Sequence, residues 1–284
     1  MPPEFRTRFA PSPTGPLHLG HAYSAILAHD MALRHGGQFL LRIEDIDRSR
    51  AKPEWERQIY DDLRWLGLAW PEPMMRQSDR LPAYHGALDR LWDQRLIYPC
   101  HCRRHDVQQA LAAPQEGVVT HGPDGMIYPG TCRPQMHLPL GPRPRDQTLR
   151  LEIGRITGGP WHYAETGSAQ AGTHKITAEQ LARDAGDIVL ARKDIGTCYH
   201  LSVVLDDAAQ GITDVVRGAD LFEATKIHVV LQNLLQLPTP TYHHHRLIRD
   251  EAGKRLAKRD DARALALYRA EGASPQDIRR MVGL

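Results

Sequence analysis

Apolar positions in the first seventy residues follow two alternating periods. Residues 6–10 read as a short strand that ends at a proline-rich turn, and residues 38–43 read as a buried strand. Between them, residues 19–34 carry apolar side chains at helical spacing until two consecutive glycines end the pattern. A second helix is expected over 53–66, beginning at a proline. Strands and helices in this order predict a parallel sheet with helices packed on its faces, an α/β fold.

The pattern changes near residue 98. From there to about residue 172 the chain is rich in proline, glycine, histidine and arginine, and only short stretches such as 148–153 look like strands. A structureless span of this length would be unusual inside a domain, so we expect an inserted subdomain. The α/β pattern then returns in three apolar runs and one helix, at 187–190, 201–205, 213–216 and 221–235.

The composition is that of an ordinary globular protein. The chain has 284 residues, of which 41% are hydrophobic and 25% charged. Its 36 basic and 34 acidic residues give a net charge of +2, which neither requires nor excludes a nucleic-acid partner. The sequence contains no apolar run typical of a signal peptide or a membrane span, and four cysteines are too few for a disulfide scaffold. We therefore expect a cytoplasmic protein without a membrane partner.

A proline-rich turn over 11–16 leads into the first predicted helix and places His18, Gly20 and His21 at its start. A helix N-terminus presents backbone N–H groups and the positive end of the helix dipole, which suits a triphosphate. Imidazoles can donate hydrogen bonds to phosphate oxygens as charge develops on them, and Gly20, lacking Cβ, would let a flat base approach the backbone. These residues predict an ATP site.

Three longer motifs carry a resemblance. RFAPSPTGPLHLGH over 8–21, LRIEDID over 41–47 and VVLDDAAQGITDVVRGADL over 203–221 resemble the catalytic domain of glutamyl-tRNA synthetases, class I aminoacyl-tRNA synthetases with a histidine–glycine signature. The resemblance implies a Rossmann-type catalytic domain interrupted by an insertion. We expect a first half at 1–97, a zinc-containing, RNA-contacting insertion at 98–186, a second half at 187–245, and a basic loop with C-terminal helices at 246–284.

The same resemblance implies a pocket for L-glutamate. Arginine guanidinium groups are fork-shaped donors that can bind the two carboxylates, Glu44 can face the ammonium group, and Tyr199 can add a hydroxyl. The sequence does not say which arginine binds which carboxylate. The expected substrate-binding residues are Arg8, Phe9, Ala10, Pro11, Ser12, Glu44, Tyr199 and Arg217.

A basic run, KRLAKR over 254–259, follows the second α/β half. Class I synthetases have a mobile lysine loop there, and by this resemblance Lys258 would contact ATP and, with His18 and His21, stabilise the charge on the phosphates. Arg255 keeps the charge of the lysine expected at its position, whereas Ala257 lacks the hydroxyl of the expected serine. The expected ATP-binding residues are His18, Gly20, His21 and Lys258, and Mg²⁺ is expected with ATP.

Three cysteines bracket part of the predicted insertion, in the pattern C-x-C followed by Y-x-x-x-C. Closely spaced thiolates suit Zn²⁺, which takes four tetrahedral ligands, so one position remains for a further residue. The local candidates are Tyr128, His101, His105 and His121. Similarity to the short synthetase paralogues that glutamylate queuosine in tRNA(Asp) favours Tyr128. The expected structural zinc ligands are Cys100, Cys102, Tyr128 and Cys132. Cys198 stands apart and is expected in the core.

The resemblance to these short paralogues implies a two-step reaction. Glutamate would be activated by ATP as glutamyl-adenylate without tRNA, and then transferred to the queuosine base in the anticodon loop of tRNA(Asp). Only 25 residues follow Arg259, so we expect no anticodon-binding domain and expect the insertion to hold the anticodon stem-loop. The protein is expected to act as a monomer. The residues supply no evident general base for the transfer.

Three alternatives remain open from the sequence. The chain could be a stand-alone glutamyl-tRNA synthetase that charges tRNA(Glu) at its 3′ end. It could be a non-catalytic RNA-binding paralogue, which the altered basic run would favour. It could also be a small-molecule nucleotidyltransferase with the same signature, although the paired arginines and the strand containing Glu44 favour glutamate over other acids.

Overall fold

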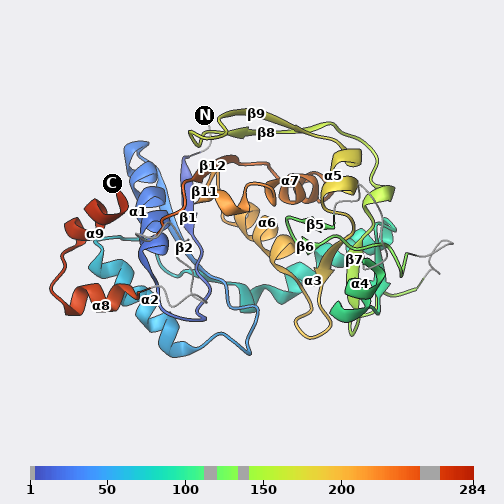
Figure 1. The fold of residues 1–284 in the computed structure, drawn as a ribbon, viewed down its shortest axis with the longest axis horizontal. Coiled ribbons are helices and arrows are strands. Elements are labelled where there is room, and N and C mark those ends of the chain that lie inside the picture. The colour runs from blue at the N-terminus through green and yellow to red at the C-terminus, as the bar shows by residue number, and fades with distance from the viewer. Residues whose placement is uncertain (1–3, 112–119, 134–140, 250–262) are drawn as a thin grey trace.

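Two sheets meet edge to edge at the centre of the fold (Figure 1). The computed structural model describes residues 4–111, 120–133, 141–249 and 263–284. Strands β1 (Arg6–Phe9), β2 (Gln38–Ile43) and β3 (Met75–Arg76) are parallel, and so are β11 (Asp214–Gly218) and β12 (Thr241–His245). The Arg6 carbonyl accepts from the Thr213 amide at 3.1 Å, and Arg8 reaches the Val216 carbonyl. Strands β1 and β11 therefore lie side by side and advance in the same direction.

The first half follows the predicted alternation. Its elements are β1 (Arg6–Phe9), α1 (Leu19–Arg34), β2 (Gln38–Ile43), α2 (Pro53–Trp65), β3 (Met75–Arg76), a 3₁₀ turn (Gln77–Arg80) and α3 (Leu81–Asp93). The four elements expected up to residue 66 are confirmed within one residue of their ends. Helix α1 buries its alanine-rich face against the sheet, and Gly36, at φ +63°, ends it in a conformation that favours glycine.

The second half contains one difference from the sequence pattern. Its elements are β10 (Ile188–Ala191), α6 (Tyr199–Ala209), β11 (Asp214–Gly218), a 3₁₀ turn (Ala219–Leu221), α7 (Thr225–Leu234) and β12 (Thr241–His245). The apolar run at 201–205, grouped in the sequence with two strand-like runs, lies within helix α6 and is buried throughout. A helix buried on several sides loses the polar positions that reveal its period, so a short run of it resembles a strand.

Between the halves lies the segment expected as an insertion. It contains β4 (Ile97–Cys100), α4 (Arg104–Leu111), β5 (His121–Gly122), β6 (Gly125–Met126), β7 (Thr148–Leu151), a 3₁₀ turn (Ile153–Arg155), β8 (Trp161–Glu165), β9 (Gly172–Ile176) and α5 (Ala178–Asp184). Strand β7 pairs with β4 and with β10, and the β8–β9 hairpin extends the sheet of β11 and β12 beside β12. Strand pairing therefore crosses the expected boundary at residue 186, and the four-part division stays a prediction.

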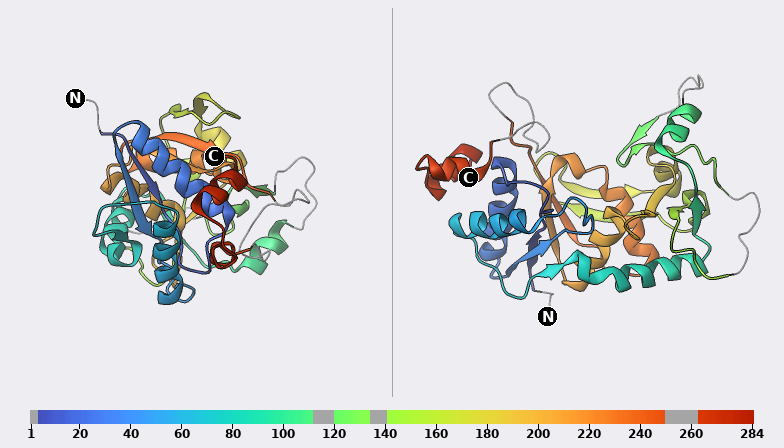
Figure 2. Two further views of the ribbon diagram at one scale, coloured as in Figure 1. Left: turned by 90° about the vertical axis from the view of Figure 1, so that its left-hand side faces the viewer. Right: turned by 90° about the horizontal axis from the view of Figure 1, so that it is seen from below.

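The remaining helices form one end of an elongated molecule (Figures 1 and 2). Helix α9 (Pro275–Val282) packs beside α1, where Arg279 forms a two-point ion pair with Asp30. Helix α8 (Leu265–Ala270) places Arg269 over the ring of Trp65 at the end of α2. Helix α4 and strand β7 lie at the opposite end. Among the described residues, no helix has the length and apolar character needed to cross a bilayer.

Sheet order fixes where a ligand can bind. From β1 the chain passes through α1 to β2 on one side, and from β11 it passes through α7 to β12 on the other. The strand order therefore reverses between β1 and β11. Open α/β sheets bind ligands at such a point, beyond the carboxyl ends of the strands.

Candidate active site and metal centre

The two signature histidines cap helix α1. The His18 Nδ1 accepts from the Gly20 amide at 3.1 Å, and the His21 Nδ1 accepts from the His18 amide at 3.2 Å. Their rings lie 3.8 Å apart. A Cβ at Gly20 would lie 3.0 Å from the His18 ring, so a side chain there would crowd the capping imidazole. Capping therefore fixes both imidazoles at the positive end of the helix.

At the end of β1, Arg8 belongs to a buried charge network. Its Nε donates to Asp207 at 2.9 Å and its terminal nitrogens donate to Asp207 and the Val216 carbonyl, both at 3.4 Å. Arg42 on β2 donates to the same carboxylate at 2.7 Å and to Glu44 at 3.1 Å. Burial alone would raise the pKa of Asp207, but the two guanidinium groups outweigh it and hold the pKa below its ordinary value. The network is thus charge-compensated within the protein.

Arg217 lies inside β11, not after it, and is almost fully enclosed by protein partners. It donates to His228 at 3.0 Å, to His244 at 3.1 Å, to Thr225 at 2.7 Å and to a backbone carbonyl at 3.3 Å. Its guanidinium group also lies over the ring of Tyr242, with 5.1 Å to the ring centroid. Both histidines have pKa values below the ordinary range, first because they are buried and second because Arg217 is close.

Tyr199 joins these groups at the start of α6. It is 36% exposed, and its ring lies 5.7 Å from that of His228. Burial raises the pKa of its hydroxyl, which also experiences the charges of Arg217, Glu44 and Arg8. Burial likewise raises the pKa of Glu44, against the nearby Arg42 and Arg8. The structure therefore brings together the four charged or polar residues expected around glutamate, from β1, β11, α6 and the end of β2.

The other expected substrate-binding residues follow β1. The ring of Phe9 is buried in the core under α1, which leaves its backbone for the site. Ala10 and Ser12 are half-buried, and the Pro11 carbonyl accepts from the Glu44 amide at 3.0 Å. This last bond fixes the turn after β1 to the end of β2.

Several residues of the site were not found from the sequence. They share burial and hydrogen bonds to the expected residues, and they are Arg42, Asp207, His200, His228, His244 and Glu165. One signal was present for one of them, Asp207. The adjacent aspartates at 206 and 207 interrupt an otherwise apolar segment, and a charge in a buried helix requires a partner.

The three cysteines expected to bind metal lie together at the far end of the molecule from α9. The sulfur atoms of Cys100, Cys102 and Cys132 all lie within 4.8 Å of one another. The Tyr128 hydroxyl is 3.5 Å from the Cys100 sulfur and 3.4 Å from the Cys102 sulfur. No histidine among the described residues belongs to this group. Cys198 is a separate, buried thiol, as expected, and burial raises its pKa to about 12.

The donor atoms of this cluster fit a tetrahedral ion. Zinc bonded to thiolates at about 2.3 Å in a tetrahedron would separate its ligand atoms by about 3.8 Å, close to the spacing found. Burial alone would raise the pKa of Cys132, yet hydrogen bonds from its neighbours lower it, which favours the thiolate. Arg150 lies over the Tyr128 ring at 3.8 Å and donates to the Cys100 sulfur at 3.3 Å.

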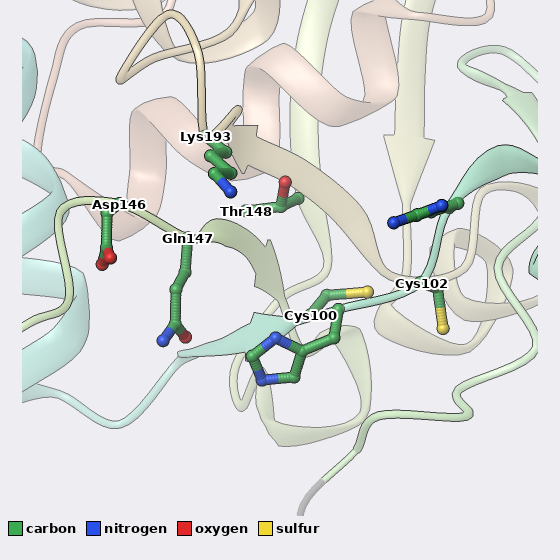
Figure 3. Close-up of a pocket in the computed structure, with 8 residues that line it drawn as sticks. Cys100, Cys102, Asp146, Gln147, Thr148 and Lys193 are labelled. Carbon is green, nitrogen blue, oxygen red and sulfur yellow. The ribbon is translucent and has the colours of Figure 1, made fainter.

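Two cavities adjoin these groups. One of about 440 Å³ is lined by Cys100 and Cys102, and Figure 3 shows Lys193 reaching toward Thr148 on its upper side. The other, of about 810 Å³, extends from Tyr199 to the cysteine region. Its basic lining residues are Arg103, Arg104, Arg150, Arg192 and Lys193. A space of this size beside the candidate amino-acid site can admit a second reactant.

Lys258, the expected ATP-contacting lysine, lies outside the described residues. The described chain ends before it at Arg249 and resumes at Arg263. Ala264 then forms a β-bridge with His18, and the amide of Leu265 donates to the Leu17 carbonyl at 2.8 Å. The chain following the basic run is thus anchored beside the capping histidines.

Sequence comparisons give a consistent family. The family model described as the catalytic domain of class I tRNA synthetases (E and Q) matches residues 4–121 and 170–284. A Rhodobacter capsulatus protein named glutamyl-Q tRNA(Asp) synthetase is 63% identical over 278 residues, which cover 98% of this chain and 99% of that protein. A Geobacter sulfurreducens protein of the same name is 41% identical over 92% of this chain and 78% of its own length.

Comparison of structures agrees with the sequence match. A crystal structure of a glutamate tRNA ligase from Elizabethkingia meningosepticum, in complex with its amino acid, is similar with a TM-score of 0.75 and 25% identity. The similarity covers 99% of this chain, which spans only 60% of that longer protein.

Proposed function

Because the chain belongs to the class I tRNA synthetases of the glutamyl and glutaminyl group, we propose that it activates L-glutamate with ATP and transfers it to RNA. The activation step forms glutamyl-adenylate and needs no tRNA. The acceptor is the queuosine base in the anticodon loop of tRNA(Asp), the tRNA in the name of the two curated relatives.

One observation carries the proposal: two guanidinium groups, a carboxylate and a tyrosine converge where the strand order reverses. Arg8 uses three N–H groups within the protein, which leaves one hydrogen on each terminal nitrogen without an acceptor among the described residues. That pair is the geometry that binds a carboxylate at two points. Arg217 uses four of its five, so it can add one contact to the substrate. Glu44 supplies the negative charge for the ammonium group.

For the adenylation step, the capping histidines supply the positions that the phosphates need. His18 and His21 are held at the N-terminus of α1. Hydrogen-bond donors there can stabilise the negative charge that develops on the pyrophosphate as it leaves. Lys258 completes this set in the proposal, since Ala264, six residues later, pairs with His18. Mg²⁺ bound with ATP would neutralise phosphate charge.

For the transfer step, the 810 Å³ cavity is the candidate site of the RNA acceptor. It reaches Tyr199, and arginines and a lysine around it suit a phosphate backbone. In the proposal, zinc bound by Cys100, Cys102, Tyr128 and Cys132 stabilises the part of the chain that carries the basic residues lining this cavity.

The test uses labelled glutamate and purified tRNAs. Glutamate-dependent exchange of pyrophosphate into ATP is expected without RNA, and aspartate or glutamine should not support it. Label should then enter tRNA(Asp) that contains queuosine, and not tRNA(Asp) that contains guanosine at that position. Mass spectrometry of the nucleosides would locate the added mass on queuosine.

Two other outcomes would replace the proposal. Labelling of tRNA(Glu) at its 3′ end, released by mild alkali and blocked by periodate oxidation, would identify a stand-alone glutamyl-tRNA synthetase. Absence of any glutamate-dependent exchange would indicate a non-catalytic RNA-binding paralogue.

A further inference from the structure

A continuous chain of hydrogen bonds connects the large cavity with the candidate amino-acid site. Asp124, on the turn between β5 and β6, accepts from the His200 Nε2 at 3.2 Å. The His200 Nδ1 lies 3.0 Å from the His228 Nε2, and the His228 Nδ1 lies 3.0 Å from a terminal nitrogen of Arg217. Both histidines are at least nine-tenths buried, whereas the Asp124 side chain is 43% exposed.

The protons in this chain can be placed by elimination. Arg217 has donors only, so the His228 Nδ1 must accept and its proton must lie on Nε2. The His200 Nδ1 then accepts that proton's hydrogen bond, and its own proton lies on Nε2, directed at the Asp124 carboxylate. The low pKa of His228, caused by burial and then by Arg217, agrees with a neutral His228 ring. Every bond in the chain therefore runs in one direction, from the guanidinium group to the carboxylate.

A second arm leaves Arg217 and ends differently. The Arg217 Nε donates to the His244 Nε2, and the His244 Nδ1 lies 2.5 Å from Glu165. Glu165 is fully buried and also accepts from two backbone amides, those of Gly167 and His244. This arm is closed inside the protein, so only the Asp124 arm ends at a cavity wall.

The end of the open arm lies in a segment that differs from the family pattern. The family model matches residues 4–121 and 170–284, so Asp124 falls in the unmatched part of the chain. His200 and His228, by contrast, lie in the matched second half. The inserted segment thus supplies one hydrogen bond to the shared site, and it does so from the wall of the cavity proposed for the acceptor.

We propose that Asp124 and His200 are positioning residues that act through His228 to orient Arg217 for glutamate. The inference rests on the proposed function, because it assigns Arg217 to that substrate. Without the carboxylate, the His200 proton loses its acceptor, both rings can take their other tautomer, and the acceptor facing Arg217 is lost in part of the population. Arg217 then has an alternative orientation, and glutamate binds less tightly.

The experiment measures pyrophosphate exchange in the full chain without RNA. Asp124→Ala should raise the KM for glutamate by roughly 5- to 20-fold, the range of one hydrogen bond, with the KM for ATP unchanged within about 2-fold. Asp124→Asn keeps an oxygen acceptor for His200 and should recover most of the affinity. His200→Phe removes both the acceptor for His228 and the bond to Asp124, and should resemble Asp124→Ala. Calorimetric titration with glutamate should give a matching change in Kd.

Asp93→Ala is the matched control, because Asp93 is an exposed aspartate at the end of α3. A wild-type KM for glutamate in Asp124→Ala and His200→Phe would overturn the proposal. A lower kcat with an unchanged KM, as expected when only part of the protein folds, would also overturn it. Equal increases in the KM values for glutamate and ATP would also overturn it, since they would indicate a general distortion. If the wild-type chain shows neither exchange nor glutamate binding, the proposed function itself fails, which is a separate result.

Discussion

The amino-acid site and the cysteine centre differ in the interactions that hold their side chains in place. Around Arg8 and Arg217, each guanidinium group has protein partners, and the network lies against large apolar cores. Around the cysteines, the buried apolar set is small: Tyr98, Cys100, Val107 and Tyr128. There the sulfur atoms lie 3.4–3.5 Å from one another or from the Tyr128 hydroxyl.

The difference indicates where each region obtains its order. The amino-acid site compensates its own charges, so it can hold its shape before a substrate arrives. The cysteine centre has donor atoms converging on a common point and too little apolar surface to hold them there, so an ion at that point is expected to supply the stability. Three changes test this contrast, in order of expected effect.

Asp207→Asn should break the self-compensation of the amino-acid site. It removes the charge shared by Arg8 and Arg42 while keeping the shape of the side chain. We expect a loss of about 3–5 kcal/mol in the free energy of unfolding, measured by urea denaturation. The reason is that removing one charge of a buried ion pair leaves the other charge buried and uncompensated. Asp30→Asn, which removes a partly exposed ion pair with Arg279, should cost at most about 1 kcal/mol. Equal losses would show that the buried network carries no special stability.

Removal of metal should affect only the cysteine centre. With a zinc chelator, amide hydrogen exchange in 97–111 and 120–133 should accelerate by about 100-fold or more, while β1, β2 and α6 stay protected. Metal analysis should give about one zinc per chain before treatment. Tyr128→Phe should lower zinc affinity by about 10-fold or more if the hydroxyl is the fourth ligand, and His121→Ala should not. If hydrogen exchange did not change on chelation, the contacts of the thiols and Arg150 would be sufficient to hold this region folded without a metal.

Lowering the pH should destabilise the protein through the histidines of the amino-acid site. Burial, and then Arg217, lower the pKa of His244 to about 4, whereas an unfolded histidine has an ordinary value near 6.5. Between these values the unfolded chain binds a proton that the folded chain does not, so stability falls as the pH drops from about 6.5 to about 4. The contribution is at most about 1.4 kcal/mol per pH unit. His244→Gln retains an acceptor for Arg217 and should flatten that slope; an unchanged slope would show that His244 is protonated in the folded protein.

Sequence reasoning could find the parts of the site that are contiguous in the chain. Arg8 lies in one predicted strand and Glu44 directly follows another, and His18 and His21 stand at a turn before a helix. Each position follows from local periodicity together with one rule about where parallel sheets bind ligands. The cysteine cluster was likewise indicated by spacing.

Residues whose role depends on tertiary contacts could not be found in this way. His200, His228 and His244 lie on three different elements, and only folding places them around Arg217. The β8–β9 hairpin was missed because histidine, lysine and glycine dilute its alternating pattern. Its pairing with β12 is a contact between distant parts of the chain, which no local window contains.

The pairing of Tyr242 with Glu165 also has a consequence for synthesis on the ribosome. Strand β8 emerges well before β12, and at about 5–20 residues per second it waits several seconds for its partner. During that interval its edge is unpaired, and an unpaired edge favours aggregation. The order of translation therefore delays attachment of the hairpin to the sheet until β12 has been synthesised.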